Sequence, residues 1–121
     1  MFIPRNGASA ICFEKVIFLF GGMNEDLGVL DEIEKYSILK GRWCQVKIKL
    51  IAPIHDCLTF NLGGARVLIF GGQTKNHCCN DRFDIYDLTI ECMSPVEYQL
   101  GHGRYALPTV FENQFGLLHL F

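Results

Sequence analysis

The residue types best suited to chemistry gather in the middle of the chain. His77, Cys78 and Cys79 are consecutive, and His55 and Cys57 precede them. Thiolates and imidazoles are common zinc ligands, but structural zinc sites usually hold them in close pairs such as Cys-x-x-Cys. No such pair occurs among the six cysteines, so the sequence predicts no metal and no cofactor. The segment around His77 is interpreted instead as a polar loop.

Catalytic and phosphate-binding motifs are likewise missing from the sequence. Residues 20–28 contain a glycine pair, but acidic residues follow where a phosphate-binding loop has Gly-Lys-Ser/Thr. The histidines and tyrosines are scattered, and their spacing indicates no Ser-His-Asp or Cys-His arrangement, because such sites assemble only in space. The sequence therefore predicts a protein that is not an enzyme.

Composition restricts the partners that the chain can have. Its 121 residues are half apolar, enough for one core, and 11 basic against 13 acidic residues give a net charge of −2. This balance offers no electrostatic surface for nucleic acid or a lipid membrane. No apolar run approaches the ~18 residues that cross a bilayer, and the N-terminus lacks a signal-peptide pattern. Cys12, Cys44, Cys57 and Cys92 lie in apolar segments, which predicts buried thiols and a cytoplasmic location.

An internal repeat organises the whole sequence. At an offset of 50 residues Gly21-Gly22 meets Gly71-Gly72, and Tyr36 meets Tyr86. The apolar residues before each glycine pair also correspond, as 17–20 with 67–70. A period near 50 residues indicates a repeat architecture, in which one supersecondary unit occurs more than once.

Each repeat is predicted to form four short strands, so the expected fold class is all-β. Runs of β-branched and aromatic residues alternate with glycine-containing or polar turns, and no segment keeps helical periodicity. The strands expected in the first unit are 7–13, 15–20, 31–38 and 43–50, and those in the second are 57–61, 66–70, 81–88 and 91–96. Four polar connections, 23–30, 51–56, 73–80 and 98–104, then lie at one end of the sheets, because successive strands run antiparallel.

This pattern resembles the kelch repeat, whose units are the four-stranded blades of a β-propeller. The first unit carries the resemblance in Pro4-Arg5, Gly21, Gly22, Tyr36 and Trp43, and the second in Gly71, Gly72 and Tyr86. The second unit departs from the pattern, with Met93 in place of the tryptophan and His55 near the place of the leading arginine. A third copy starts at Gly103-Arg104. The resemblance implies one blade in residues 1–52, a second in 53–100 and a truncated third in 101–121.

The resemblance also implies a function. Propellers close with about 4 to 8 blades, so further blades in the same or another chain are expected, and the chain is expected to be part of a longer propeller. Kelch propellers mostly bind proteins through their loops, which implies an intracellular scaffold or adaptor. The candidate partner-binding residues are Arg5, Asn24, Glu25, Asp26, His55, Lys75, Asn76, His77 and Arg104. The alternative is an enzyme or metal site completed by missing blades.

Overall fold

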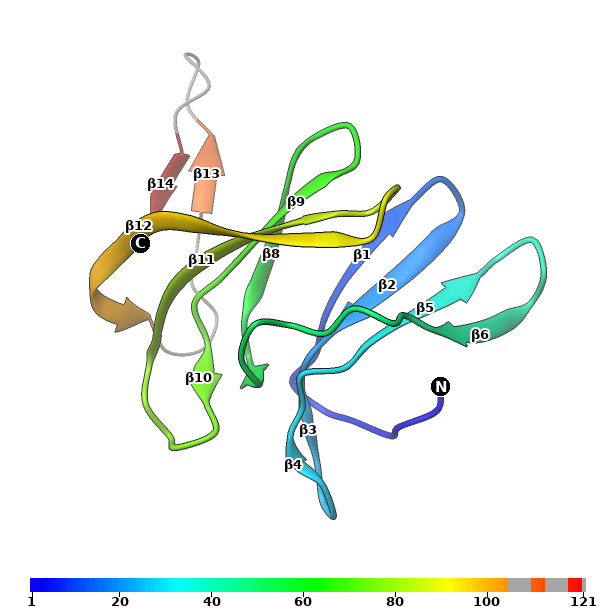
Figure 1. Ribbon diagram of the computed structural model, residues 1–121, viewed down its shortest axis with the longest axis horizontal. Helices are drawn as coiled ribbons and strands as arrows, with labels where there is room; N and C mark the ends of the chain where they lie inside the picture. Colours follow the sequence, from blue (N-terminus) through cyan, green and yellow to red (C-terminus); the bar gives the residue numbers. More distant parts are fainter. Residues whose placement is uncertain (105–109, 113–117, 121) are drawn as a thin grey trace.

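Two four-stranded antiparallel sheets form the framework of the molecule (Figure 1). The computed structural model describes residues 1–104, 110–112 and 118–120, with side chains up to residue 96. The first sheet has the order β1-β2-β5-β6, formed by Ser9–Phe13, Val16–Phe20, Ile33–Ser37 and Arg42–Gln45. The second has the order β12-β11-β9-β8, formed by Cys92–Arg104, Asn80–Asp87, Arg66–Phe70 and Leu58–Gly63.

Three pairs of short strands accompany the sheets. They are β3 with β4 (Met23–Asn24, Gly28–Val29), β7 with β10 (Ile54–His55, Gln73–Thr74) and β13 with β14 (Val110–Glu112, Leu118–Leu120). No helix occurs among the described residues, hence none able to cross a bilayer. The expected all-β class is confirmed, and the sheets do not close into a ring within this part of the chain.

Two strands end more than two residues away from the expected position. β6 ends at Gln45 rather than at residue 50, because the regular ladder of hydrogen bonds stops there. Beyond it, two isolated backbone hydrogen bonds tie the chain to the first sheet, from Val46 N to Ile33 O (3.1 Å) and from Leu50 N to Asp31 O (2.8 Å). β12 continues to Arg104, so residues 98–104, expected as a connecting loop, belong to a strand. The register shifts between β11 and β12 at Arg82 accommodate this longer strand.

The main core lies between the two sheets. Strand alternation turns Phe18 and Phe20 of β2 toward the second sheet, where the Tyr86 ring meets the Phe20 ring with centroids 5.4 Å apart. The edge strands β1 and β8, one from each sheet, touch through the hydroxyls of Ser9 and Thr59, whose oxygens are 2.9 Å apart. The two repeats therefore pack with a face of one sheet against a face of the other.

Candidate functional site

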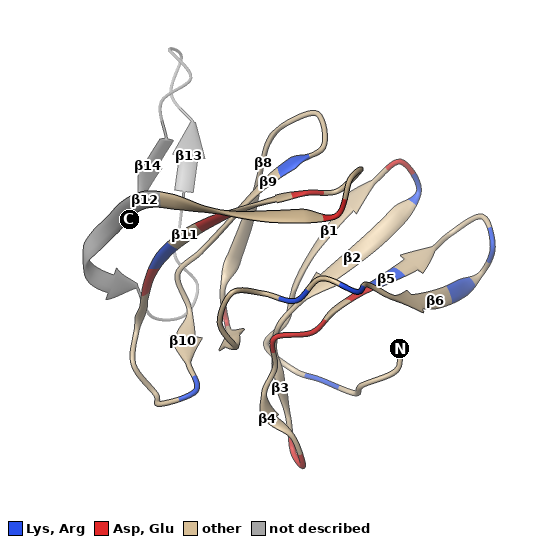
Figure 2. Ribbon diagram, viewed as in Figure 1, with Lys and Arg blue, Asp and Glu red and all other residues tan. Residues whose placement is uncertain are grey.

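The connections between strands separate into two ends of the molecule (Figure 1). The loop end carries residues 23–30 and 73–80, which follow β2 and β9. The turn end carries the turns 14–15, 38–41, 64–65 and 88–91. Figure 2 shows acidic residues at the tip of the β3–β4 hairpin and a basic residue beyond β10, both at the loop end. Exposed charges at one end of a sheet scaffold form a candidate binding surface.

The glycine pairs anchor the loop end to the sheets. Gly22 has a φ of 103°, and its N–H donates to Ile54 O (2.9 Å) in the segment that leads to the second sheet. A Cβ at Gly72, where φ is 80°, would lie 2.4 Å from His55 O. Only glycine combines positive φ with so close an approach of two backbones. Both loops therefore begin from tightly held positions.

Asn24 shapes the first loop from within. Its side-chain amide donates to Pro4 O (2.7 Å), and its Oδ1 accepts from the N–H groups of Asp26 and Leu27 (2.9 Å each). This Asx turn leaves Glu25 and Asp26 exposed at the tip. Of the three candidates on this loop, Asn24 positions the tip, whereas Glu25 and Asp26 face solvent.

The second loop presents Lys75, Asn76 and His77, all exposed. Its turn is closed by the bond from His77 N to Thr74 O (3.1 Å), and Gln73 Nε2 donates to His77 O (3.1 Å). The neighbouring thiols of Cys78 and Cys79 are exposed and free. Within the residues that the structure describes, no group of three or more His, Cys, Asp or Glu side chains is placed to hold a metal ion.

Arg5 lies inside the first repeat and not at its surface. Its side chain is 1% exposed and forms an ion pair with Glu34, which is fully buried. The guanidinium also donates to Gly21 O (2.8 Å) and Glu32 O (3.1 Å). These bonds occupy Arg5 within the chain, so in this structure it braces β2 against β5 instead of facing a partner.

Glu34 is a residue that the sequence analysis missed. Its carboxylate accepts from Arg5 and from the N–H groups of Phe2 (2.5 Å) and Ile3 (3.3 Å), so it also ties the N-terminal segment to β5. The offset of 50 residues pairs Glu34 with Asp84, another buried carboxylate. The signal in the sequence was an acidic residue that recurs at the same position of both repeats, two residues before the repeat tyrosine.

The second repeat replaces this arrangement with shorter side chains. His55 stands at the position equivalent to Arg5 and is buried, with its Nδ1 2.8 Å from Asp56 Oδ2. Asn80 Nδ2 donates to Gly71 O (2.9 Å), the bond that corresponds to the one from Arg5 to Gly21 O. Asp84 pairs with Arg82 (3.0 Å). The Nε2 of His55 has no hydrogen-bond partner among the described residues.

The last candidate, Arg104, and the two repeat tyrosines lie on strands. Arg104 ends β12 opposite Asn80, and its side chain lies outside the described residues. Tyr36 packs on Trp43 of the adjacent strand, with ring centroids 5.2 Å apart. Tyr86 is completely buried, and burial raises its pKa well above the usual range.

The prediction of buried cysteines is only partly correct. Cys57 is buried and Cys44 is half-buried, whereas Cys12 and Cys92 are exposed. Cys12 alternates with Ile11 and Phe13, which pack against the core between the sheets, so its side chain lies on the opposite face of β1. Burial raises the pKa of the Cys57 thiol to about 12.

Comparisons with known proteins agree with this architecture. The family model for the Kelch motif matches residues 4–48. Host cell factor 1 of Homo sapiens is 31% identical over 86 residues, which are 70% of this chain and 4% of that protein. The N-acetylneuraminate epimerase of Vibrio vulnificus is 30% identical over 77 residues, 59% of this chain and 20% of that protein. The chain thus spans a small part of the length of these relatives.

A solved structure shows the same fold. The structure of YjhT superimposes with a TM-score of 0.75 at 16% sequence identity, covering 88% of this chain and 42% of that one. The match to the Kelch motif over residues 4–48, the two four-stranded sheets and the shared fold together show that the chain carries a Kelch motif and is built of kelch-type β-propeller blades.

Proposed function

We propose that the chain is a non-enzymatic protein-interaction module, acting as a cytoplasmic scaffold or adaptor that binds a protein partner through its loop end. The observation that carries this proposal is a pair of exposed loop tips of opposite charge on equivalent positions of a repeated scaffold. Glu25 and Asp26 form the acidic tip, and Lys75 lies on the other tip. Binding residues concentrate on loops that a rigid framework positions.

The two tips define the kind of partner that fits. A partner with a basic patch opposite Glu25 and Asp26 and an acidic patch opposite Lys75 is complementary to both loops. Such charge complementarity directs the orientation of docking and raises the association rate more than it adds affinity. Asn76 and His77 extend the second tip with polar groups for hydrogen bonding. Further blades in the same or another chain complete the ring in this proposal.

A second candidate is a propeller enzyme whose site is completed by other blades. The His55–Asp56 pair favours it, because a carboxylate that orients an imidazole leaves the other ring nitrogen to act as a base. The similarity to an N-acetylneuraminate epimerase points in the same direction. However, His55 is buried, with Nε2 closed to solvent. A substrate therefore has no access to it, and we favour the interaction module.

Charge-reversal variants test the proposal. Partners recovered by the full chain from a cell extract are compared with those of Glu25→Lys/Asp26→Lys and Lys75→Glu, with Arg66→Glu near the turn end as the matched control. Loss of the same proteins with both loop variants, and their retention by the control, supports the loop end as the binding surface. Equal recovery by all four proteins contradicts it. Turnover of N-acetylneuraminate, followed by NMR, would support the enzyme instead.

A further inference from the structure

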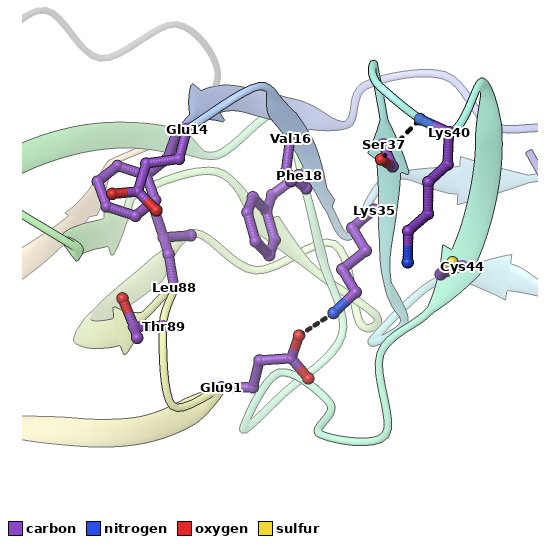
Figure 3. Close-up of a pocket in the computed structure, with 11 residues that line it drawn as sticks. Glu14, Val16, Phe18, Lys35, Ser37, Lys40, Cys44, Leu88, Thr89 and Glu91 are labelled. Atoms are coloured by element: carbon purple, nitrogen blue, oxygen red, sulfur yellow. Dashed lines mark hydrogen bonds and ion pairs between the residues drawn. The ribbon is translucent and has the colours of Figure 1, made fainter.

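A cleft opens between the two sheets at the turn end, away from the loop tips (Figure 3). It has a volume of about 410 Å³, within the range of about 300–1,000 Å³ that is usual for ligand sites. The first sheet contributes one wall from its β1–β2 turn and from β5 and β6, and the β11–β12 turn contributes the other. The cleft thus exists only because two repeats are packed together.

The base of the cleft is apolar. Phe13, Val16 and Phe18 line it from the first sheet, and Leu88 lines it from the second. Figure 3 shows the Phe18 ring and Leu88 facing the same space. An apolar side chain placed there loses contact with water on several sides, and this removal of apolar surface from water favours binding.

One ion pair closes the cleft on a further side. Lys35 Nζ bonds to Glu91 Oε1 across the gap between the sheets, and both side chains are about one-third exposed. These two charges neutralise each other, so neither is available to a ligand without breaking the pair. The charge that a ligand meets must come from the other titratable side chains of the lining.

Two such charges remain, and they have opposite signs. Glu14 and Lys40 line the cleft, are exposed, and have no ion-pair partner among the described side chains. Figure 3 shows them on opposite sides, with Phe18 between them. A complementary ligand therefore carries a cationic group on the Glu14 side, an apolar group in the middle and an anionic group on the Lys40 side.

The surroundings favour a protein segment over a small polar molecule. Leu39 and Ile90 are 78% and 71% exposed, and Ile38 is 49% exposed. They lie on the two turns that also supply Lys40 and Glu91 to the cleft. Large apolar side chains exposed beside a cleft are typical of protein interaction sites.

We propose that the cleft binds an extended segment of a partner protein in which one bulky apolar side chain stands between a basic and an acidic residue. The apolar side chain packs on Phe13, Phe18 and Leu88, the acidic residue pairs with Lys40, and the basic residue pairs with Glu14. This surface lies at the opposite end from the loop tips and does not depend on what they bind. The chain is then able to hold two partner segments at once, which is what a scaffold requires.

The test uses a fluorescein-labelled probe peptide, Gly-Ser-Lys-Phe-Glu-Ser-Gly, titrated with the full chain while its fluorescence anisotropy is followed. A second peptide with serine in place of phenylalanine measures the apolar contribution. Lys40→Glu and Glu14→Lys alter exposed side chains, and circular dichroism with urea unfolding verifies that both variants are folded. Lys75→Glu at the loop end is the matched charge control.

The expected result is binding of the phenylalanine peptide that either cleft variant weakens by about fivefold or more, with no effect of Lys75→Glu. A charge-swapped probe has Lys-Phe-Lys in its centre, so its second lysine is complementary to the glutamate of the Lys40→Glu variant. This variant should therefore bind the charge-swapped probe more tightly than the Lys-Phe-Glu probe. A purely structural role of Lys40 does not predict that preference. The proposal is overturned if no probe binds at millimolar concentration, if the serine peptide binds equally well, or if Lys75→Glu weakens binding as much as Lys40→Glu.

Discussion

Replacement of Arg5 by methionine should destabilise the chain severely. Methionine keeps most of the apolar length of the arginine side chain but removes four hydrogen bonds, to Ile3 O, Gly21 O, Glu32 O and the Glu34 carboxylate. Glu34, which is fully buried, is then left without a cationic partner and with only two backbone N–H donors. An uncompensated charge of this kind is far more costly than the loss of the ion pair itself.

The size of the effect follows from the burial of the pair. The two side chains are 1% and 0% exposed, so solvent does not screen what remains after one partner is removed. Removing one member of a buried pair costs about 3–5 kcal/mol, against a total of about 5–15 kcal/mol for a domain of ordinary stability. Arg5→Met should therefore lower the urea midpoint strongly or leave the chain unfolded.

Urea unfolding followed by circular dichroism measures this effect, and a double-mutant cycle isolates the pair. The combined Arg5→Met/Glu34→Met variant should be more stable than the sum of the single changes predicts, by about 2 kcal/mol or more, because no unpaired carboxylate is left in the core. Lys49→Met is the matched control, since Lys49 pairs with Asp31 and Glu32 at the surface and should leave the midpoint nearly unchanged. Equal small effects of Arg5→Met and Lys49→Met would refute this explanation.

Three further changes test other parts of the fold. Gly72→Ala should destabilise the chain by about 2 kcal/mol or more, because a Cβ there meets His55 O at 2.4 Å, whereas Gly64→Ala in open space should cost less; a similar fall in the urea midpoint of both would contradict this. Tyr86→Phe should be neutral or stabilising by about 1 kcal/mol in thermal unfolding, because the buried hydroxyl has no partner among the described residues, and a large loss would show that it has one. The free energy of unfolding should be insensitive to Cys57 ionisation below pH 9 and should fall at higher pH, because the unfolded thiol loses its proton near 9.0 and the folded one only near 12. By about pH 10.5 this loss is about 2 kcal/mol, and Cys57→Ala, measured in reducing buffer, should remove it; an unchanged pH dependence would show that Cys57 ionisation does not cause the loss.

Much of the fold was predictable because its signals are local. The strands β2 and β9 are runs of apolar residues ended by glycine pairs, and those glycines adopt the positive φ that such a break suggests. The turn at Glu14-Lys15 joins β1 to β2 with both residues at positive φ, as a tight hairpin requires. The end of β12 was not predictable in this way, since a strand continues only where a partner such as β11 extends beside it.

Only part of the candidate site could likewise be predicted from the sequence. The polar loop tips at Glu25, Asp26 and Lys75 could be recognised from the sequence, because they are polar segments between strands and the structure leaves them exposed. The burial of Arg5 and His55 could not be recognised, since the sequence shows a charged residue before a strand and not which atoms surround it. Whether a side chain is exposed depends on how the whole molecule packs, and not on the residues next to it in the sequence.

The sequence by itself determined the unit of this protein: a four-stranded repeat of 50 residues, punctuated by glycine pairs whose backbone requirements act over a few residues. Only the tertiary structure decided how the repeats use their side chains. It buried Arg5 against Glu34, exposed Cys12, and formed the cleft between Phe18 and Leu88. The reason is physical, since periodicity assigns a residue to a face of a strand, but ion pairing, burial and clefts depend on which other face is packed against it.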